Sequence, residues 1–172
     1  TRGDIETVDN ILYYNSDENN KIAVRFLNTT NDFVGTVNID GSTSVIGQYC
    51  FVRTGIREVA IPANCKAIGS GAFLSLATLE TVNFDEGSLL ETFGMYCFDK
   101  CTSLTKVDFD KCVNVTTFNI FSFRDTHIQS VTFHEKLSVL DGNAIQYNSY
   151  LKTVRLNTTF ELELDSLLSY FL

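Results

Sequence analysis

The segment "IGSGAFLSLATLETVNF" at residues 68–84 is followed, 25 residues later, by "FGMYCFDKCTSLTKVDF" at residues 93–109. The two segments place apolar, small and polar residues at the same offsets, although most of their letters differ. Repetition of residue types at a fixed spacing is typical of a chain that folds as stacked copies of one structural unit. The fold of this chain therefore follows from how its copies stack.

Five copies can be aligned on a column that carries an aromatic ring in four of them. The members of this ring column, spaced by 22, 25, 25 and 22 residues, are Phe51, Phe73, Phe98, Phe123 and Ile145. A valine column follows in the same copies at Val59, Val82, Val107, Val131 and Val154. Because the copies agree at several apolar columns, we interpret the chain as a solenoid in which each copy buries the apolar side of the next.

Local patterns within the copies predict backbone conformation. The Leu-x-x-Val-x-Phe portion alternates apolar and polar residues, which predicts a short strand. Another column holds only residues that tolerate positive φ, and we expect a tight backbone corner there. The members of this corner column are Gly47, Gly69, Gly94, Asn119 and Asp141.

The residue pattern of the copies resembles that of the BspA-like subclass of the leucine-rich repeat superfamily. The segments "IGSGAF" and "YCFDKCTSLTKVDF" carry the resemblance, which extends from residue 43 to about residue 164. It implies an α/β-type solenoid with a concave parallel β-sheet of short strands and a convex side of loops and short helices. It also implies that ligands bind on the concave sheet.

The N-terminal residues depart from the repeat. "ILYY" at 11–14 and "KIAVRF" at 21–26 flank the turn-rich "NSDENN", which predicts a β-hairpin that caps the solenoid. "FVGTVNI" at 33–39 supplies a first half-repeat. We therefore divide the chain into a cap with a half-repeat, residues 1–42, and about five repeats in 43–172, of which the last is incomplete at Leu164.

The spacing of the five cysteines and two histidines indicates neither a disulfide framework nor a zinc site. Cys50 and Cys97 are equivalent positions two copies apart, beyond the reach of a disulfide, and no His-rich pattern favours zinc. We expect buried thiols, with Cys112 as the most exposed. The sequence contains no nucleophile–base pair or phosphate loop, so we predict neither an enzyme, nor a metal site, nor a cofactor.

Composition excludes some partners. The net charge of −8 and the absence of a basic cluster disfavour nucleic acid, and no stretch of about 18 apolar residues predicts insertion in a membrane. Three Asn-x-Thr sequons, at Asn28, Asn114 and Asn157, are candidate glycosylation sites if the chain is secreted. The alternative is that a chain rich in Asn and Thr acquires sequons by chance.

Polar residues alternate with the apolar columns on the strands and are expected to line the exposed face of the sheet. They form a grid with an acidic centre, bordered by a histidine and an arginine. The predicted ligand-binding residues are Asn83, Asp85, Asp108, Asp110, Thr132, His134 and Arg155. The alternative is that these residues only keep the face solvated.

The resemblance implies a non-catalytic recognition module on the cell surface or secreted. BspA-like proteins are adhesins of mucosal bacteria and parasitic protists, so the expected partner is a host-surface, extracellular-matrix or microbial surface protein. The alternative is a cytoplasmic scaffold that holds partner proteins together, which the free thiols and the absence of an apolar leader favour.

Overall fold

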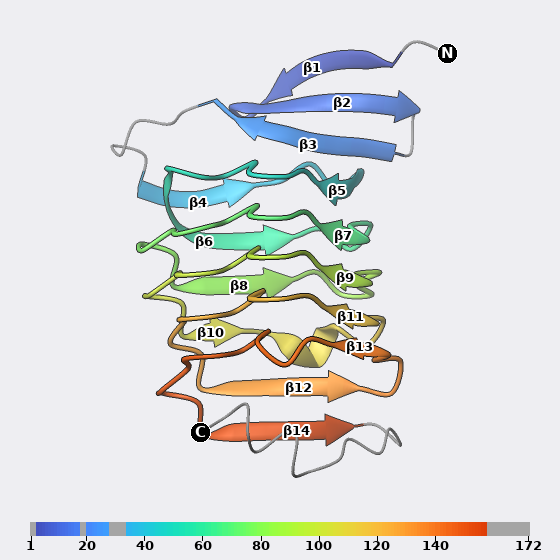
Figure 1. Cartoon of the computed structure of the whole chain (residues 1–172). Coiled ribbons are helices and arrows are strands. Elements are labelled where there is room, and N and C mark those ends of the chain that lie inside the picture. The colour runs from blue at the N-terminus through green and yellow to red at the C-terminus, as the bar shows by residue number, and fades with distance from the viewer. Residues whose placement is uncertain (1–2, 18–19, 28–33, 158–172) are drawn as a thin grey trace.

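Two stacks of parallel strands run the length of a β-solenoid of about six turns (Figure 1). The computed structural model describes residues 3–17, 20–27 and 34–157. One stack, which we call the long-strand sheet, contains β4 (Val34–Asn38), β6 (Gly55–Ile61), β8 (Thr81–Phe84) and β10 (Lys106–Val107), and is continued by β12 (Ser130–His134) and β14 (Thr153–Asn157). These are the strands that the Leu-x-x-Val-x-Phe pattern predicts.

The second stack was not predicted from the sequence. Its members are β5 (Thr43–Ile46), β7 (Ala67–Ile68), β9 (Thr92–Phe93), β11 (Thr117–Phe118) and β13 (Val139–Leu140). Most of these strands contain only two residues, too few for an alternation pattern to be visible in the sequence. Each ends at the apolar residue that precedes the corner column.

Strand register confirms the alignment of the copies. Val59 pairs with Val37 on one side and with Val82 on the other, and Val82 pairs in turn with Val107. Val131 pairs with Val154 in β12 and β14. Because each column meets itself in the neighbouring coil, a side chain that fits the interior once fits it repeatedly.

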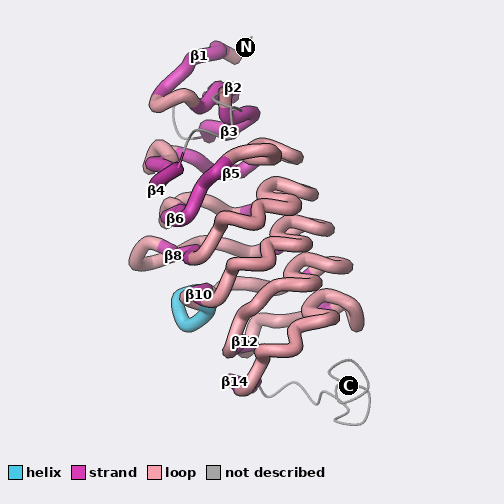
Figure 2. Tube along the Cα trace, turned by 90° about the vertical axis from the view of Figure 1, so that its left-hand side faces the viewer, coloured by secondary structure: helices cyan, strands magenta, loops and turns pink. Residues whose placement is uncertain are grey.

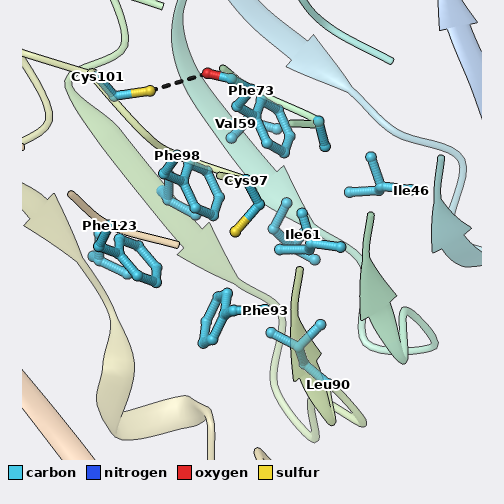
Figure 3. Packing of buried hydrophobic residues seen from close by; sticks show 14 of the residues in the cluster. Ile46, Val59, Ile61, Phe73, Leu90, Phe93, Cys97, Phe98, Cys101 and Phe123 are labelled. Atoms are coloured by element: carbon cyan, nitrogen blue, oxygen red, sulfur yellow. Dashed lines mark hydrogen bonds between the residues drawn. The ribbon is translucent and has the colours of Figure 1, made fainter. Parts of the chain in front are cut away.

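The ring column forms a continuous ladder through the core. Phe51, Phe73 and Phe98 stack with centroid distances of 4.9 Å at each step, and Phe123 follows at 5.0 Å. Figure 3 shows the last three of these rings in line, beside Cys97 and Phe93. The spacing matches the distance between neighbouring strands, so the coil repeat and the ring repeat reinforce each other.

The expected α/β character and the short helices of the convex side are wrong. The one helix among the described residues is η1 (Phe109–Lys111), a 3₁₀ turn that directly follows β10 in the long-strand sheet (Figure 2). The segments around the ring column are turns with positive φ both two residues before and two residues after the ring, as at Tyr49 and Arg53. A right-handed helix cannot contain such residues.

The prediction of positive φ in the corner column is also wrong. Among the described residues the positive φ values of glycine occur only at Gly71 and Gly87. Gly94 is small for another reason, since a Cβ there would lie 2.6 Å from the carbonyl oxygen of Ile68 in the preceding coil. Close approach of two backbones therefore selects glycine in this column.

The predicted hairpin is present, and it is extended by a third strand. β2 (Ile11–Asp17) pairs antiparallel with β3 (Asn20–Phe26), and β1 (Asp4–Val8) pairs antiparallel with β2. β3 then joins the parallel stack through β5. Tyr13 and Ala23 are fully buried, so the hairpin covers the end of the core as a cap should.

Candidate binding surface on the long-strand sheet

Of the seven predicted ligand-binding residues, four lie on strands of the long-strand sheet and one, Asp110, lies in η1, whereas Asp85 and Asp108 come just after β8 and β10. Asn83 lies on β8, Thr132 and His134 on β12, and Arg155 on β14. Asp85 directly follows β8. We call the outward side of this sheet the polar face and define it by these seven residues, the remaining two of which are Asp108 and Asp110.

The acidic centre of the polar face does not lie on a strand. β10 contains only Lys106 and Val107, and η1 begins at Phe109. The expected alternation therefore ends at Asp108, although Phe109 remains buried. The flat grid predicted from the sequence is thus interrupted at its centre by a 3₁₀ turn.

Asp110 connects the 3₁₀ turn to the next two coils. Its Oδ1 accepts a hydrogen bond of 2.9 Å from the hydroxyl of Thr132, and its Oδ2 lies 3.8 Å from a guanidinium nitrogen of Arg155. Thr132 is only 4% exposed, which contradicts its predicted place on the open face. η1 contacts β12, and the Thr132 hydroxyl donates its hydrogen bond to Asp110, so this hydroxyl is not available to a ligand.

The other residues of the polar face are held by contacts between coils or are free. The Nδ2 of Asn83 donates to Glu58 at 2.8 Å, and Nε2 of His134 lies 3.0 Å from the carbonyl oxygen of Phe109. Asp85 is exposed and pairs with no cation among the described residues. Asp85 and Asp110 therefore present the most accessible carboxylates of the acidic centre.

Sequence reasoning missed a lysine that partly neutralises this centre. Lys111 lies 3.0 Å from Glu86 and 3.6 Å from Asp108, and these carboxylates, Glu86 first, raise its pKa above the usual value. Its spacing of three residues from Asp108 was a visible signal, but it indicates a contact only if the chain turns there. The centre is consequently acidic at Asp85 and Asp110, and Lys111 offsets one of the two negative charges of Glu86 and Asp108.

The cysteines lie in the core, and Cys112 lies next to the polar face, where its Sγ contacts the Asp108 carbonyl oxygen. All five are free and buried, including Cys112, whose predicted exposure is wrong because it follows η1 back into the interior. Burial raises the pKa of Cys50, Cys65 and Cys101 to about 12, and the Sγ of Cys101 donates to the Phe73 carbonyl at 3.0 Å (Figure 3). These thiols act as small apolar side chains.

The three candidate glycosylation sites differ in what the structure places around them. Asn157 is exposed at the end of β14, whereas Asn28 lies outside the described residues. Asn114 is half-buried, and its Nδ2, the atom to which a glycan would be attached, donates to the Ser88 carbonyl at 2.8 Å. Its Oδ1 accepts from Lys136. Asn157 is therefore the more accessible of the two described sites.

Within the described residues no three His, Cys, Asp or Glu side chains are arranged to hold a metal ion. The same part of the chain contains no helix that is long and apolar enough to cross a membrane. The polar face presents polar side chains, several of which are held in place by contacts between coils.

A known repeat family accounts for the pattern of the sequence. The family described as BspA type leucine rich repeat region matches residues 25–161 in six copies. The chain belongs to this family. Leucine-rich repeat proteins mediate protein–protein interactions. The matched residues include both the polar face and the core beneath it.

Solved structures of bacterial leucine-rich repeat proteins share the fold. A leucine-rich repeat protein of Treponema pallidum is 20% identical with a TM-score of 0.73, over 90% of this chain and 72% of that one. One from Bacteroides ovatus is 20% identical with a TM-score of 0.71, over 88% and 41%. A leucine-rich cell surface protein of Faecalibacterium prausnitzii is 17% identical with a TM-score of 0.51, over 91% and 55%.

The chain thus spans about half the length of the F. prausnitzii protein and less than half of the B. ovatus protein. No curated protein matches the sequence. At these identities the likeness concerns the fold alone.

Proposed function

We propose that this BspA-type chain is a non-catalytic recognition module that binds a protein on a host cell, in the extracellular matrix or on another microbe. The observation that carries the proposal is the polar face, where contacts between coils hold Asn83, Asp110 and His134 in place. Groups fixed before binding lose little conformational entropy when a partner docks. A solenoid can spread such contacts over several coils instead of concentrating them in a pocket.

The chemistry of the polar face favours a basic partner. Asp85 and Asp110 are exposed, and 64% of the Asp110 side chain is accessible to solvent despite its contact with Arg155. Lysine or arginine side chains of a partner can reach both carboxylates without disturbing the core. Because these contacts are solvent-exposed, the affinity should fall as the salt concentration rises.

Location at the cell surface, or secretion, is part of the proposal. The F. prausnitzii protein with the same fold is described as a cell surface protein, and PcpA, which also shares it, as a pneumococcal vaccine antigen. Glycosylation at Asn157 would agree with passage through a secretory pathway. Five buried thiols with raised pKa values are compatible with an oxidising environment, because thiolates are the reactive form.

The test is binding of the labelled 172-residue chain to cultured mucosal epithelial cells and to a basement-membrane extract. The native chain should bind saturably. A variant with Asp85→Asn, Asp108→Asn and Asp110→Asn should bind about tenfold more weakly, because it loses several exposed charge contacts. Asparagine keeps an acceptor for the Thr132 hydroxyl, so the 3₁₀ turn is retained.

The matched control carries the same change of net charge away from the polar face. Asp4→Asn, Asp9→Asn and Glu91→Gln replace three exposed carboxylates at other places. Equal binding by the native chain and this control supports the polar face. An equal loss of affinity in both variants would show that net charge, and not the polar face, determines binding. If the native chain does not bind, the cytoplasmic scaffold becomes the better hypothesis.

A further inference from the structure

A second exposed surface lies on the turns around the ring column, at residues 48–53, 95–100 and 120–125. Tyr49 and Tyr96 are 49% and 36% exposed. They occupy the same column of the repeat as Phe121, two residues before the ring column. Arg53, Lys100 and Arg124 belong to the same turns. We call these six residues the turn ridge. It belongs to the turns and not to the long-strand sheet, and it shares no residue with the polar face.

The aromatic residues of the turn ridge adopt an unfavourable backbone conformation. The φ values of Tyr49, Tyr96 and Phe121 are 53°, 57° and 55°. This left-handed region is costly for bulky side chains and easy for glycine, which occupies the equivalent place at Gly71. Three coils therefore carry an aromatic ring at a position whose backbone conformation favours glycine. Strain of this kind is often found at functional surfaces.

A buried carboxylate fixes the cationic part of the ridge. Asp99 is 2% exposed and accepts hydrogen bonds of 2.7 Å from both Nε and Nη2 of Arg124. The guanidinium carbon of Arg124 lies 4.0 Å from the centroid of the Phe121 ring, and the Phe121 and Tyr96 rings are 5.4 Å apart. An aromatic pair covered by a guanidinium is thus held rigid at the surface.

The remaining cations of the ridge are available to a partner. Arg53 and Lys100 are exposed and pair with no carboxylate among the described residues. In these turns the only outward carboxylate is Asp125, in the last of them. The ridge is thus locally basic in a chain with a net charge of −8. Charge complementarity therefore favours an acidic partner here, the opposite of the partner expected at the polar face.

We propose that the turn ridge is a second docking surface, which binds an acidic protein segment that carries aromatic or aliphatic side chains beside its carboxylates. The carboxylates pair with Arg53 and Lys100, and the apolar side chains lie on Tyr49, Tyr96 and Phe121. Rigid aromatic rings next to unpaired cations give a large contact area at a low entropy cost. The proposal does not depend on the polar face.

The probe is a random glutamate–tyrosine copolymer, with polyglutamate and polylysine beside it. The copolymer should bind more tightly than polyglutamate, and polylysine should not bind at the ridge. In a titration followed by NMR, amide shifts should concentrate in 48–53, 95–100 and 120–125. Absence of binding, or shifts confined to the residues of the polar face, would overturn the proposal.

Charge reversal separates the ridge from the net charge. Arg53→Glu with Lys100→Glu should weaken binding of the copolymer about tenfold. The matched control, Lys66→Glu with Lys152→Glu, changes two exposed lysines elsewhere and should retain more than half of the affinity of the native chain. Equal loss in both variants contradicts a localised site. The Asp85, Asp108 and Asp110 variant should bind the copolymer like the native chain, so the two proposals can fail independently.

Substitution of an aromatic residue distinguishes recognition from structural support. Asparagine tolerates positive φ, so Tyr96→Asn should weaken copolymer binding severalfold while leaving the midpoint of thermal unfolding unchanged or higher. Tyr96→Phe keeps the ring and should bind like the native chain. If Tyr96→Asn unfolds at a markedly lower temperature and binds normally, the ridge is a packing device.

Discussion

The regular coils between Thr43 and Phe98 differ from the coil that contains η1. In the regular coils, β6 and β8 pair through four residues, and the rings of Phe51, Phe73 and Phe98 are almost parallel, with interplanar angles of 7° and 3°. In the other coil, β10 pairs through two residues before the 3₁₀ turn. Phe109 meets three rings there, and the two most nearly edge-on are Phe93 and Phe123.

The comparison shows that the buried columns are the same in both kinds of coil, whereas the contacts of the outward side chains differ. Phe109 is 2% exposed although its backbone is no longer extended, so the interior column is filled in both kinds of coil. Its outward neighbours differ, because Asp108, Asp110 and Lys111 make contacts that an extended strand would not allow. The buried columns therefore define the solenoid, while outward side chains can bend a single coil.

The largest expected effect comes from breaking the ring ladder in a regular coil. Phe73→Ala removes a fully buried ring that is stacked on both sides, and we expect the free energy of unfolding to fall by about 4 kcal/mol. Urea denaturation measures the change. Tyr147→Ala, at a side chain that is 70% exposed, is the control and should change it by less than about 0.5 kcal/mol. A similar loss in both variants would contradict the assignment of the core.

A second substitution tests the close approach of backbones in the corner column. Gly94→Ala places a Cβ 2.6 Å from the Ile68 oxygen and 2.8 Å from the carbonyl carbon of Gly69, and should destabilise the chain by about 3 kcal/mol. Gly41→Ala is the matched control, because no atom lies within 4 Å of its Cβ. Thermal unfolding of both proteins measures the difference. If Gly94→Ala unfolds like the native chain, contact between coils does not explain the glycine.

The sequence was sufficient to predict the repeat, the register of the long strands and the ring ladder. These features could be predicted because each column repeats at a regular interval and contacts its own copy, as Val59 contacts Val82. The role of glycine in the corner column was misjudged because a sequence shows that a residue is small but not why. Close approach and positive φ both select glycine, and only the structure separates them.

The polar face was predicted less well than the core. Thr132 contacts η1 and Cys112 directly follows it. "KVDFDK" at 106–111 nevertheless shows the same alternation as "TVNFDE" at 81–86, whose first four residues form the strand β8. The difference lies in contacts between coils, such as that from Thr132 to Asp110, which no local pattern contains. The helices expected on the convex side were an inference from the family resemblance, and the positive φ values of the turns exclude them.

The third prediction compares Asp40, which lies after β4 next to the cap, with Asp85 in a regular coil, because the two residues occupy the same outward column. Hydrogen bonds from Ser42, together with Lys21 of the cap, lower the pKa of Asp40 from 3.8 to about 2. A lowered pKa in the folded state stabilises the chain above the unfolded value, and this stabilisation disappears as the pH falls towards 2.

Asp40→Asn should therefore reduce the free energy of unfolding by up to about 2 kcal/mol at pH 7. The difference from the native chain should shrink between pH 4 and pH 2. Chemical denaturation at a series of pH values measures it. Asp85→Asn, in the same column but without a cation partner among the described residues, is the control and should show no such trend. A difference that persists at pH 2 would show that Asp40 acts through hydrogen bonds and not through its charge.

The smallest expected effect tests what holds the interrupted coil in place. Thr132→Val keeps the shape of a buried side chain and removes the hydroxyl that donates to Asp110. The free energy of unfolding should therefore fall by about 1 kcal/mol. Thr153→Val, on the exposed side of β14, is the matched control and should be nearly neutral. Amide hydrogen exchange gives the sharper readout, because loss of the contact should increase exchange at Lys111 and Cys112, whose amides bond within the turn. Unchanged exchange there would mean that burial of Phe109, and not the contact between Thr132 and Asp110, is sufficient to form the 3₁₀ turn.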